Sequence, residues 1–310
     1  MSDERTKGVV IIPAHNEEKT IGEIIRRVPR NICDEVCIIV VDDGSTDGTA
    51  EVAQREGAHV VRHRRNRGLA QALKTGIKVG LSKDADIFIS IDADGQYLPE
   101  EMPKLTSPIT EGKADLVLGS RFAGHIEEMP WIKHAGNRMF TWFMRRLTDF
   151  PFTDTQTGFR AFNKNLAENV FLHGKYTYTQ EMLIHVVEKG FEIVEVPILF
   201  AKRRYGESRL IVNPLTYAVK AFMIALRTYR DYHPMKLFGL FGVIMVGLGL
   251  ILGGYLTALW LMYGVVGRIP SVVLTVLLIM SGIMSLIFGF LADMLITLRE
   301  ELRETIKGGR

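Results

Sequence analysis

The chain has 310 residues and a formal net charge of +3. This length exceeds one average domain, although a single α/β domain can reach it, and the small net charge gives no electrostatic support for nucleic-acid binding. Cys33 and Cys37 lie far from any histidine cluster that would indicate zinc. We therefore expect both to be inert thiols in a reducing compartment.

Short apolar runs alternate with stretches of helical periodicity along the first part of the chain, after a polar start that lacks the apolar core of a signal peptide. The expected strands are residues 9–12, 37–41, 59–62, 87–91 and 115–119. The expected helices are residues 19–28, 49–56, 99–110 and a segment that follows Gly68 and ends near residue 81. This alternation predicts a doubly wound, mainly parallel α/β sheet.

Polar loops follow three of these strands, at residues 13–17, 42–47 and 92–96. The carboxyl ends of parallel strands lie at one edge of a sheet, where ligands bind. Alternation along an extended chain points Asp92 and Asp94 toward one spot. Two such carboxylates suit Mg²⁺ or Mn²⁺, which also takes oxygens from a substrate diphosphate. For an Asp-x-Asp tripeptide alone, a solvated turn is the alternative.

The loop sequences also narrow the class of ligand. Neither a G-x-G-x-x-G motif nor a Walker sequence follows the first strand, so a dinucleotide site and a P-loop are not indicated. An aspartate at the end of the second strand can accept hydrogen bonds from a base or a ribose. The crevice is therefore expected to bind a metal-bound nucleoside diphosphate compound, and the metal would neutralise charge on a departing diphosphate.

Beyond residue 122 the pattern is looser. Residues 133–150 mix aromatic and basic side chains, which favours a helix at a membrane interface, with a partly buried surface helix as the alternative. A helix at about 178–189 and a strand at 193–200 follow. Residues 214–232 again combine apolar and basic side chains, and we expect an amphipathic helix that lies on the membrane.

Two long apolar stretches lie near the C-terminus. Residues 237–267 and 269–292 contain no Asp, Glu, Lys or Arg, and each exceeds the ~20 residues that a membrane-spanning helix needs. A buried helical hairpin in a soluble protein is the alternative. Lys and Arg flank both outer ends, which places both termini in the cytoplasm. We expect an integral membrane protein with a domain at 1–211, a juxtamembrane helix at 212–234, a transmembrane hairpin at 235–298 and a cytoplasmic tail at 299–310.

Arginines near the predicted cleft indicate an anionic acceptor. Arg121, Arg203 and Arg209 are expected on loops, and arginine can hold a phosphate through two parallel hydrogen bonds. Taken singly, each could instead be a solvated surface residue. The run Arg203-x-x-Gly206-x-Ser208-Arg209 favours a tight phosphate-binding turn. A phosphate held beside a membrane points to a lipid phosphate, which is ionised near neutral pH and needs no general base to attack a sugar carbon.

These motifs, together and in order, resemble glycosyltransferase family 2. The matching runs are Pro13–Glu17, Asp42–Thr49, Asp92–Gln96, Gly119–Arg121 and Arg203–Arg209. Within that family the chain is similar to the dolichol-phosphate mannose synthase and polyprenyl-phosphate glycosyltransferase group, over about residues 9 to 211. The resemblance implies a GT-A fold and an inverting reaction that moves one sugar from a nucleotide-sugar to a polyprenyl or dolichyl phosphate. The product would be a lipid-linked sugar donor for glycosylation. GDP-mannose is slightly favoured as donor, with UDP-glucose and UDP-N-acetylglucosamine left open.

The resemblance also implies roles for individual residues. Residues expected to contact the nucleotide-sugar are Pro13, His15, Glu17, Val41, Asp43, Asp92, Ala93, Asp94, Gln96 and Arg121. Metal ligands would be Asp92, Asp94 and Gln96. The acceptor phosphate would contact Arg138, Arg203, Ser208 and Arg209. Candidate catalytic residues are Asp92, Asp94, Arg121, Asp154 and Glu181. Asp154 and Glu181 would orient the sugar, act as base toward a hydroxyl acceptor, or be satisfied structural carboxylates.

Two other functions compete with this interpretation. A processive polysaccharide synthase would carry a Gln-x-x-Arg-Trp motif, which the sequence lacks. A membrane scaffold that has lost catalysis would show a broken metal motif, whereas Asp92 and Asp94 are both present. The expected partners are thus a nucleotide-sugar, a polyprenyl phosphate and the lipid membrane, and not nucleic acid. Packing of the amphipathic helices against a second copy stays open.

Overall fold

The computed structural model describes residues 5–169, 178–203, 233–264 and 269–308, together with the single positions 223, 226, 227 and 230. The chain divides into two compact units, Met1–Val219 and Lys220–Arg310. The predicted amphipathic helix at 214–232 lies almost entirely outside the described residues.

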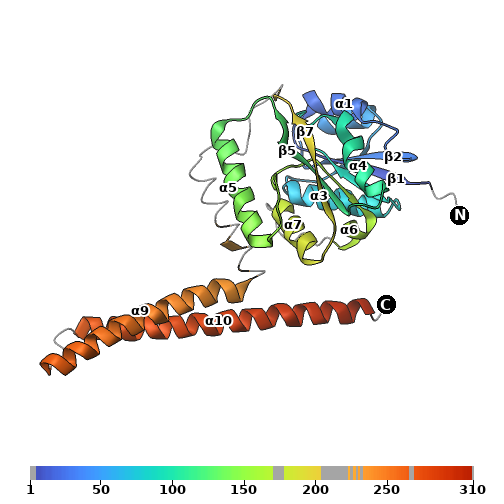
Figure 1. The fold of residues 1–310 in the computed structure, drawn as a ribbon. Helices are drawn as coiled ribbons and strands as arrows, with labels where there is room; N and C mark the ends of the chain where they lie inside the picture. Colours follow the sequence, from blue (N-terminus) through green and yellow to red (C-terminus); the bar gives the residue numbers. More distant parts are fainter. Residues whose placement is uncertain are drawn as a thin grey trace. The chain divides into compact units, whose positions relative to one another are not determined.

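The first unit is built on a seven-stranded sheet with the order β3-β2-β1-β4-β6-β5-β7 (Figure 1). The strands are β1 Lys7–Ala14, β2 Glu35–Asp42, β3 His59–Arg62, β4 Ile87–Ser90, β5 Leu116–Ile126, β6 Arg160–Asn163 and β7 Ile193–Phe200. Only β6 pairs antiparallel with its neighbours, while the other pairs are parallel. The prediction of a mainly parallel α/β sheet is therefore confirmed.

Two strands differ from the sequence-based expectation. β6 was not predicted, because it is only four residues long and opens with a charged Arg160. β5 was expected to end at Gly119 but continues to Ile126. It does so through an irregularity between Ser120 and His125 in its pairing with β7, and this pairing lets polar residues continue a strand that an apolar pattern would end.

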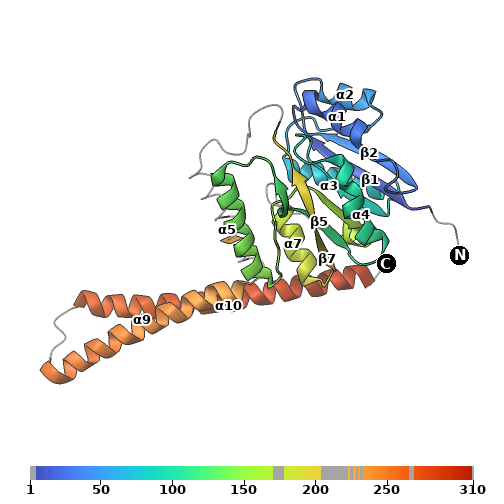
Figure 2. The same ribbon diagram turned by 45° about the horizontal axis from the view of Figure 1, so that its top comes forward.

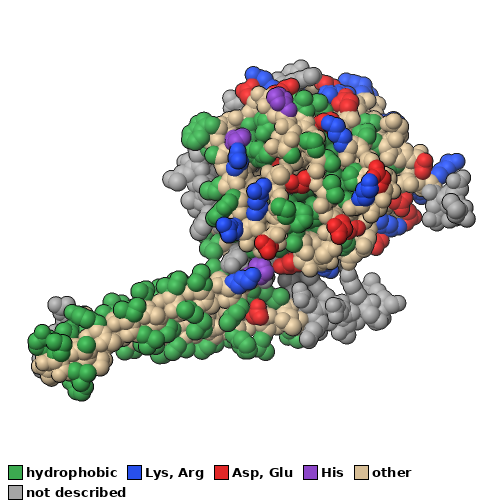
Figure 3. Space-filling view, in the orientation of Figure 1, with side chains coloured by type: hydrophobic (Ala, Val, Ile, Leu, Met, Phe, Trp, Pro, Cys, Tyr) green, Lys and Arg blue, Asp and Glu red, His purple; other side chains and the backbone are tan. Residues whose placement is uncertain are grey.

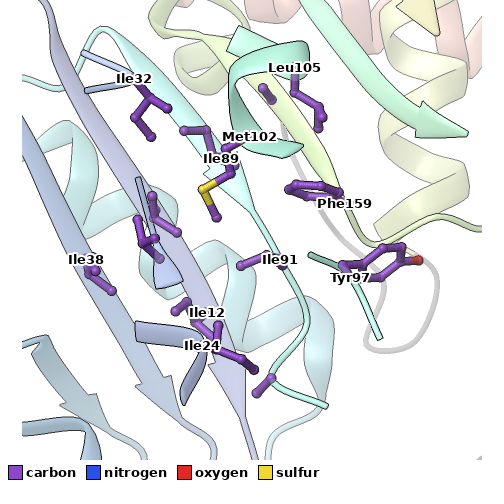
Figure 4. Packing of buried hydrophobic residues seen from close by; sticks show 14 of the residues in the cluster. Ile12, Ile24, Ile32, Ile38, Ile89, Ile91, Tyr97, Met102, Leu105 and Phe159 are labelled. Atoms are coloured by element: carbon purple, nitrogen blue, oxygen red, sulfur yellow. The ribbon is translucent and has the colours of Figure 1, made fainter. Parts of the chain in front are cut away.

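Helices cover both faces of the sheet, as Figures 1 and 2 show. They are α1 Glu18–Arg27, α2 Thr49–Arg55, α3 Leu69–Leu81, α4 Met102–Thr110 after the 3₁₀ turn η1 Pro99–Glu101, α5 Trp131–Thr148, α6 Lys164–Asn169 and α7 Tyr178–Glu188. Alternate residues of β1 point to opposite faces. Ile12 belongs to the core cluster that contains Ile24 of α1 and Met102 of α4 (Figure 4), whereas Ile11 meets Gly76 of α3. Both faces of β1 are thus buried.

The second unit is a helical hairpin of α9 Pro234–Tyr263 and α10 Ile269–Gly308. Each helix contains a 30-residue segment that is long and apolar enough to cross a membrane, Pro234–Tyr263 and Ile269–Leu298. Apolar side chains line the exposed surface of both helices (Figure 3). The Ser285 hydroxyl donates to the Phe238 carbonyl oxygen over 2.8 Å and so joins the two helices. The predicted tail at 299–310 continues α10 as helix as far as Gly308.

Close packing of α3 on the sheet predicts the cost of one added methyl group. An alanine Cβ at position 76 would collide with the Ile11 side chain, and overpacking of this kind costs about 1–3 kcal/mol of unfolding free energy. We expect Gly76→Ala to lower the thermal unfolding midpoint of the purified protein by several degrees. Lys74→Ala, on the exposed face of the same helix, is the control and should leave the midpoint unchanged. Equal midpoints for both variants would contradict this packing.

Candidate active site

The three loops that the sequence singled out meet at one edge of the sheet. β2, β1 and β4 are adjacent and parallel, so their carboxyl ends lie side by side. Hydrogen bonds tie the loops together. Asn16 N donates to Ser45 Oγ over 2.9 Å, Thr46 N to Asn16 Oδ1 over 2.8 Å and Thr20 Oγ1 to Ala93 O over 2.6 Å. The predicted crevice is therefore built from one hydrogen-bonded frame.

Asp92 and Asp94 follow β4 at the centre of this edge. Burial and the neighbouring Asp94 charge raise the pKa of Asp92 to about 7, against the opposing effects of Arg121, Lys133 and Arg160. Gly158 lies directly on the Asp92 carboxylate, since a Cβ there would come within 2.5 Å of Asp92 Oδ2. The site thus holds two mutually repelling carboxylates in confined space, and a bound cation would relieve that repulsion.

The donor set fits a divalent cation that keeps ligands from water and substrate. Mg²⁺ is usually held by one or two carboxylates plus substrate phosphates, which matches Asp92 and Asp94. In the described part of the chain, no group of three or more His, Cys, Asp or Glu side chains could hold a metal by itself. Gln96 supports the loop, because its backbone N–H donates to Asp94 Oδ1 over 3.1 Å and its amide to Ala201 O over 3.4 Å. Its role as a metal ligand stays a prediction.

Arg203 brings a positive charge to the same carboxylates. Its Nη2 lies 3.3 Å from Asp94 Oδ2 and 3.7 Å from Glu17 Oε1. The segment is held there because Ala201 N donates to Gln96 O over 2.8 Å. The sequence predicts that Arg203 binds the acceptor phosphate. In the structure its side chain contacts Asp94, which is a predicted metal ligand. Ser208 and Arg209, predicted for the same phosphate, lie outside the described residues.

Arg121 and Asp154 form a buried, two-pronged ion pair. Arg121 Nε donates to Asp154 Oδ2 over 2.6 Å and Nη2 to Oδ1 over 2.8 Å. The Arg121 backbone N–H adds a third bond of 3.1 Å. Asp154 is fully buried, so its oxygens are occupied in fixing Arg121. This geometry favours the structural alternative for Asp154 over a general base. The side chain of Glu181, the other candidate, lies outside the described part.

Lys133 in the first turn of α5 is a site residue that the sequence-based analysis missed. Burial lowers its pKa, as do the charges of Arg121 and Arg203, while Asp94 and Asp92 act in the opposite direction. The charge of Lys133 therefore interacts with the charges of both carboxylates and both arginines of the site. In the sequence, Lys133 is a lysine at the start of a helix with aromatic and basic residues. Many surface lysines have the same setting, so the sequence does not distinguish it from them.

An arginine-rich cavity of about 580 Å³ lies between β5 and α5. The residues that line it are Arg121, Phe122, Gly124, Ile126, His134, Arg138, Thr141, Trp142, Arg145 and Thr153. Arg138, predicted for the acceptor phosphate, is among them, and Arg121 borders the cavity while it is paired with Asp154. The cavity thus offers guanidinium groups beside aromatic and apolar surface.

Asp43 anchors the loop that follows β3. It is buried, and its carboxylate accepts hydrogen bonds from His63 Nδ1 over 2.6 Å, Arg67 N over 2.9 Å and Gly68 N over 2.7 Å. The other ring nitrogen of His63 lies 3.0 Å from Thr75 Oγ1. Only one of these three bonds reaches Oδ2, which leaves that oxygen an accepting position for a ligand. The sequence-based analysis missed His63, which belongs to no motif.

The other residues predicted around the nucleoside line the same edge. Pro13, Val41 and Ala93 are buried at the ends of β1, β2 and β4, and His15 and Glu17 are half-buried in the loop after β1. Val41 has no exposed surface, so its side chain supports the sheet beneath the loops. Contact between a nucleoside and these five residues stays a prediction.

The carboxylate pair predicts how metal binding responds to mutation. We expect Asp92→Asn and Asp94→Asn each to weaken Mn²⁺ binding by on the order of 10-fold or more, because each removes one of two anionic ligands. Electron paramagnetic resonance of free and bound Mn²⁺ gives the affinity. Asp84→Asn is the control, because Asp84 is an exposed aspartate in a left-handed turn that asparagine accepts. Unchanged Mn²⁺ affinity in both site variants would contradict the metal assignment.

The Arg121–Asp154 pair predicts a stability effect that a general base would not show. We expect Asp154→Ala to lower the unfolding free energy by about 3–5 kcal/mol, because it leaves a buried guanidinium without its counter-ion. Denaturant unfolding of the purified protein measures this, with the exposed Glu111→Ala as control. If Asp154→Ala abolished activity with stability unchanged, the positioning role would be wrong.

Comparison with known proteins identifies the family. Residues 9–171 match the model of glycosyl transferase family 2. A polyprenol monophosphomannose synthase of Mycolicibacterium smegmatis is 32% identical over 214 residues, which are 65% of this chain and 80% of that protein. A UDP-N-acetylglucosamine–dolichyl-phosphate N-acetylglucosaminyltransferase of Methanococcus voltae is 31% identical over 223 residues, covering 64% of this chain and 88% of that protein.

A solved structure shares the fold. Glucosyl-3-phosphoglycerate synthase from Mycobacterium tuberculosis, in complex with phosphoglyceric acid, superposes with a TM-score of 0.57 at 23% identity. The superposition covers 71% of this chain and 80% of that one. Because the family match spans more than half of the 310 residues, the chain belongs to glycosyl transferase family 2.

Proposed function

We propose that the protein transfers one sugar from a nucleotide-sugar to a polyprenyl (dolichyl) phosphate. The observation that carries the proposal is the sharing of Arg121 between two adjacent regions. On one side, Arg121 pairs with the buried Asp154, and its charge opposes the rise in the pKa of Asp92 in the carboxylate site. On the other side, Arg121 lines the arginine-rich cavity. A metal-bound diphosphate fits the first region and an anionic acceptor fits the second.

The donor is proposed to be GDP-mannose, with UDP-N-acetylglucosamine and UDP-glucose as the alternatives. The Mycolicibacterium relative is named for mannose and the Methanococcus relative for UDP-N-acetylglucosamine. Both names include a polyprenyl or dolichyl acceptor, which supports the acceptor more strongly than either donor.

The residues of the site support direct attack by a phosphate. A divalent cation held by Asp92 and Asp94 would neutralise charge on the departing diphosphate. Lys133 and Arg203 add positive charge at the same place, where donor and acceptor phosphates would otherwise repel each other. An ionised phosphate acceptor needs no proton removed, and this agrees with Asp154 being committed to Arg121. Attack from the face opposite the diphosphate would invert the anomeric centre.

We propose further that α9 and α10 anchor the protein in a membrane, with the catalytic domain and both termini in the cytoplasm. Support comes from the length and hydropathy of the two helices and from the basic residues at their outer ends. On α5, Trp131 and Trp142 are 77% and 59% exposed, and Arg146 lies 5.9 Å from the Trp142 ring. Exposed tryptophan beside arginine favours a position at the lipid headgroups.

The test of this function is a transfer assay. Purified protein, Mn²⁺ or Mg²⁺ and dolichyl phosphate are mixed with radiolabelled GDP-mannose, UDP-glucose or UDP-N-acetylglucosamine, and label in the organic phase is counted. We expect transfer from one donor, and loss of transfer when EDTA removes the metal. No transfer from any donor, while a nucleotide-sugar still binds, would overturn the proposed acceptor.

Arg203 provides a prediction about the acceptor. We expect Arg203→Ala to raise the KM for dolichyl phosphate by on the order of 10-fold, because a charge-assisted hydrogen bond to phosphate is lost. The KM for the donor should change less. Lys202→Ala is the control, because Lys202 is exposed and paired with Glu128. A change confined to the donor KM would assign Arg203 to the diphosphate.

A further inference from the structure

Two glutamine side chains near the site form a pair with unused hydrogen-bonding capacity. Gln180 Nε2 donates to Gln156 Oε1 over 3.2 Å. The remaining amide groups, Gln156 Nε2 and Gln180 Oε1, are buried and have no hydrogen-bond partner among the residues that the structure describes. Gln180 is only 6% exposed. Buried amides are normally satisfied, so a free donor and a free acceptor at one place need a partner, which a ligand or a water supplies.

The pair keeps one free donor and one free acceptor whichever way the two amides are oriented. Exchanging oxygen and nitrogen in both side chains reverses the bond between them, and exchanging only one would place like groups together. In either allowed arrangement, one NH₂ group and one carbonyl oxygen remain free. The pair therefore always presents one donor and one acceptor.

The loop that carries Gln156 contacts the candidate active site on either side of this residue, at Asp154 and at Gly158. Gln156 stands between Asp154, whose Oδ1 accepts its backbone N–H over 3.1 Å, and Gly158, which rests on the Asp92 carboxylate. Gln180 is in the first turn of α7. The buried Arg160 holds both segments, because it donates to Thr155 O over 3.3 Å and to Thr179 O over 3.4 Å.

We propose that the Gln156–Gln180 pair binds a hydroxyl group of the sugar that is transferred. A hydroxyl both donates and accepts, and so matches the free carbonyl and the free NH₂ group. The pair adjoins both the loop of the metal carboxylates and the partner of Arg121, between which the sugar of a bound nucleotide-sugar would lie. The inference rests on the proposed function for the identity of the ligand. It assigns the pair a role in distinguishing one sugar from another, because a site built to hydrogen-bond a hydroxyl rejects an analogue that lacks it.

The experiment compares a nucleotide-sugar with its own nucleoside diphosphate. Calorimetric titrations with Mn²⁺ use GDP-mannose against GDP, and UDP-glucose or UDP-N-acetylglucosamine against UDP, on the full-length protein and its Gln156→Met and Gln180→Met variants. Methionine keeps the side-chain length and removes the amide. We expect each variant to bind the preferred nucleotide-sugar on the order of 10-fold more weakly, with unchanged affinity for the diphosphate. Gln54→Met, on the exposed face of α2, is the matched control.

Single-deoxy analogues of the preferred donor identify the hydroxyl. Wild-type protein should lose affinity for one analogue only, and the methionine variants should not distinguish that analogue from the parent donor. Equal weakening of diphosphate and nucleotide-sugar, or no weakening of either, would overturn the proposal and assign the free groups to a buried water.

Folding is monitored separately through the thermal unfolding midpoint. Each methionine variant breaks the Gln156–Gln180 hydrogen bond and leaves the other buried amide unpaired, so the midpoint should fall by a few degrees. If a methionine variant does not fold, Gln156→Asn, which retains an amide one methylene shorter, replaces it. Because the titrations contain no lipid phosphate, failure of transfer to dolichyl phosphate would leave this result standing.

Discussion

Repulsion between two carboxylates at the end of β4 is the constraint around which the site is built. Asp92 and Asp94 share a confined space, and burial together with the Asp94 charge raises the pKa of Asp92 to about 7. The chain surrounds them with the cations of Arg121, Lys133, Arg160 and Arg203. The side chains that carry these charges must be held in place, and Asp154 holds Arg121 through their ion pair. Such alternation of fixed charges can hold a divalent ion and a diphosphate without large rearrangement.

The arrangement of these charges distinguishes between roles for Asp154 and Arg203 that sequence motifs alone leave open. Asp154 could have been a base, but it gives its oxygens to Arg121, so its influence on a reaction would pass through that guanidinium. Arg203 could have belonged to the acceptor alone, yet it touches Asp94. An arginine that contacts a predicted metal ligand would interact with both the donor and the acceptor phosphate of the proposed reaction. In the proposed reaction, the arginine-rich cavity beside β5 would provide a second position for an anion.

The sequence predicted where β1, β2 and β4 end, because buried β-branched runs followed by polar loops are local signals. The loops after β1, β2 and β4 do meet at one edge. Local patterns failed where long-range contacts decide the structure. β6 is four residues long and exists through its pairing with β4 and β5. His63 and Gln180 are held by residues distant in the sequence, Asp43 for His63 and Gln156 for Gln180, and Lys133 likewise interacts with the distant Asp92 and Asp94. No spacing rule connects such pairs.

The central claim is that the carboxylates after β4 bind a metal that in turn holds a diphosphate. Phosphorus-31 electron–nuclear double resonance of the Mn²⁺-loaded protein, with GDP or UDP added, tests it most directly. The account predicts hyperfine coupling between Mn²⁺ and the nucleotide phosphorus atoms in the wild-type protein, and loss of that coupling in the Asp94→Asn variant. Mn²⁺ bound to the wild-type protein without phosphorus coupling, or identical coupling in the variant, would contradict it.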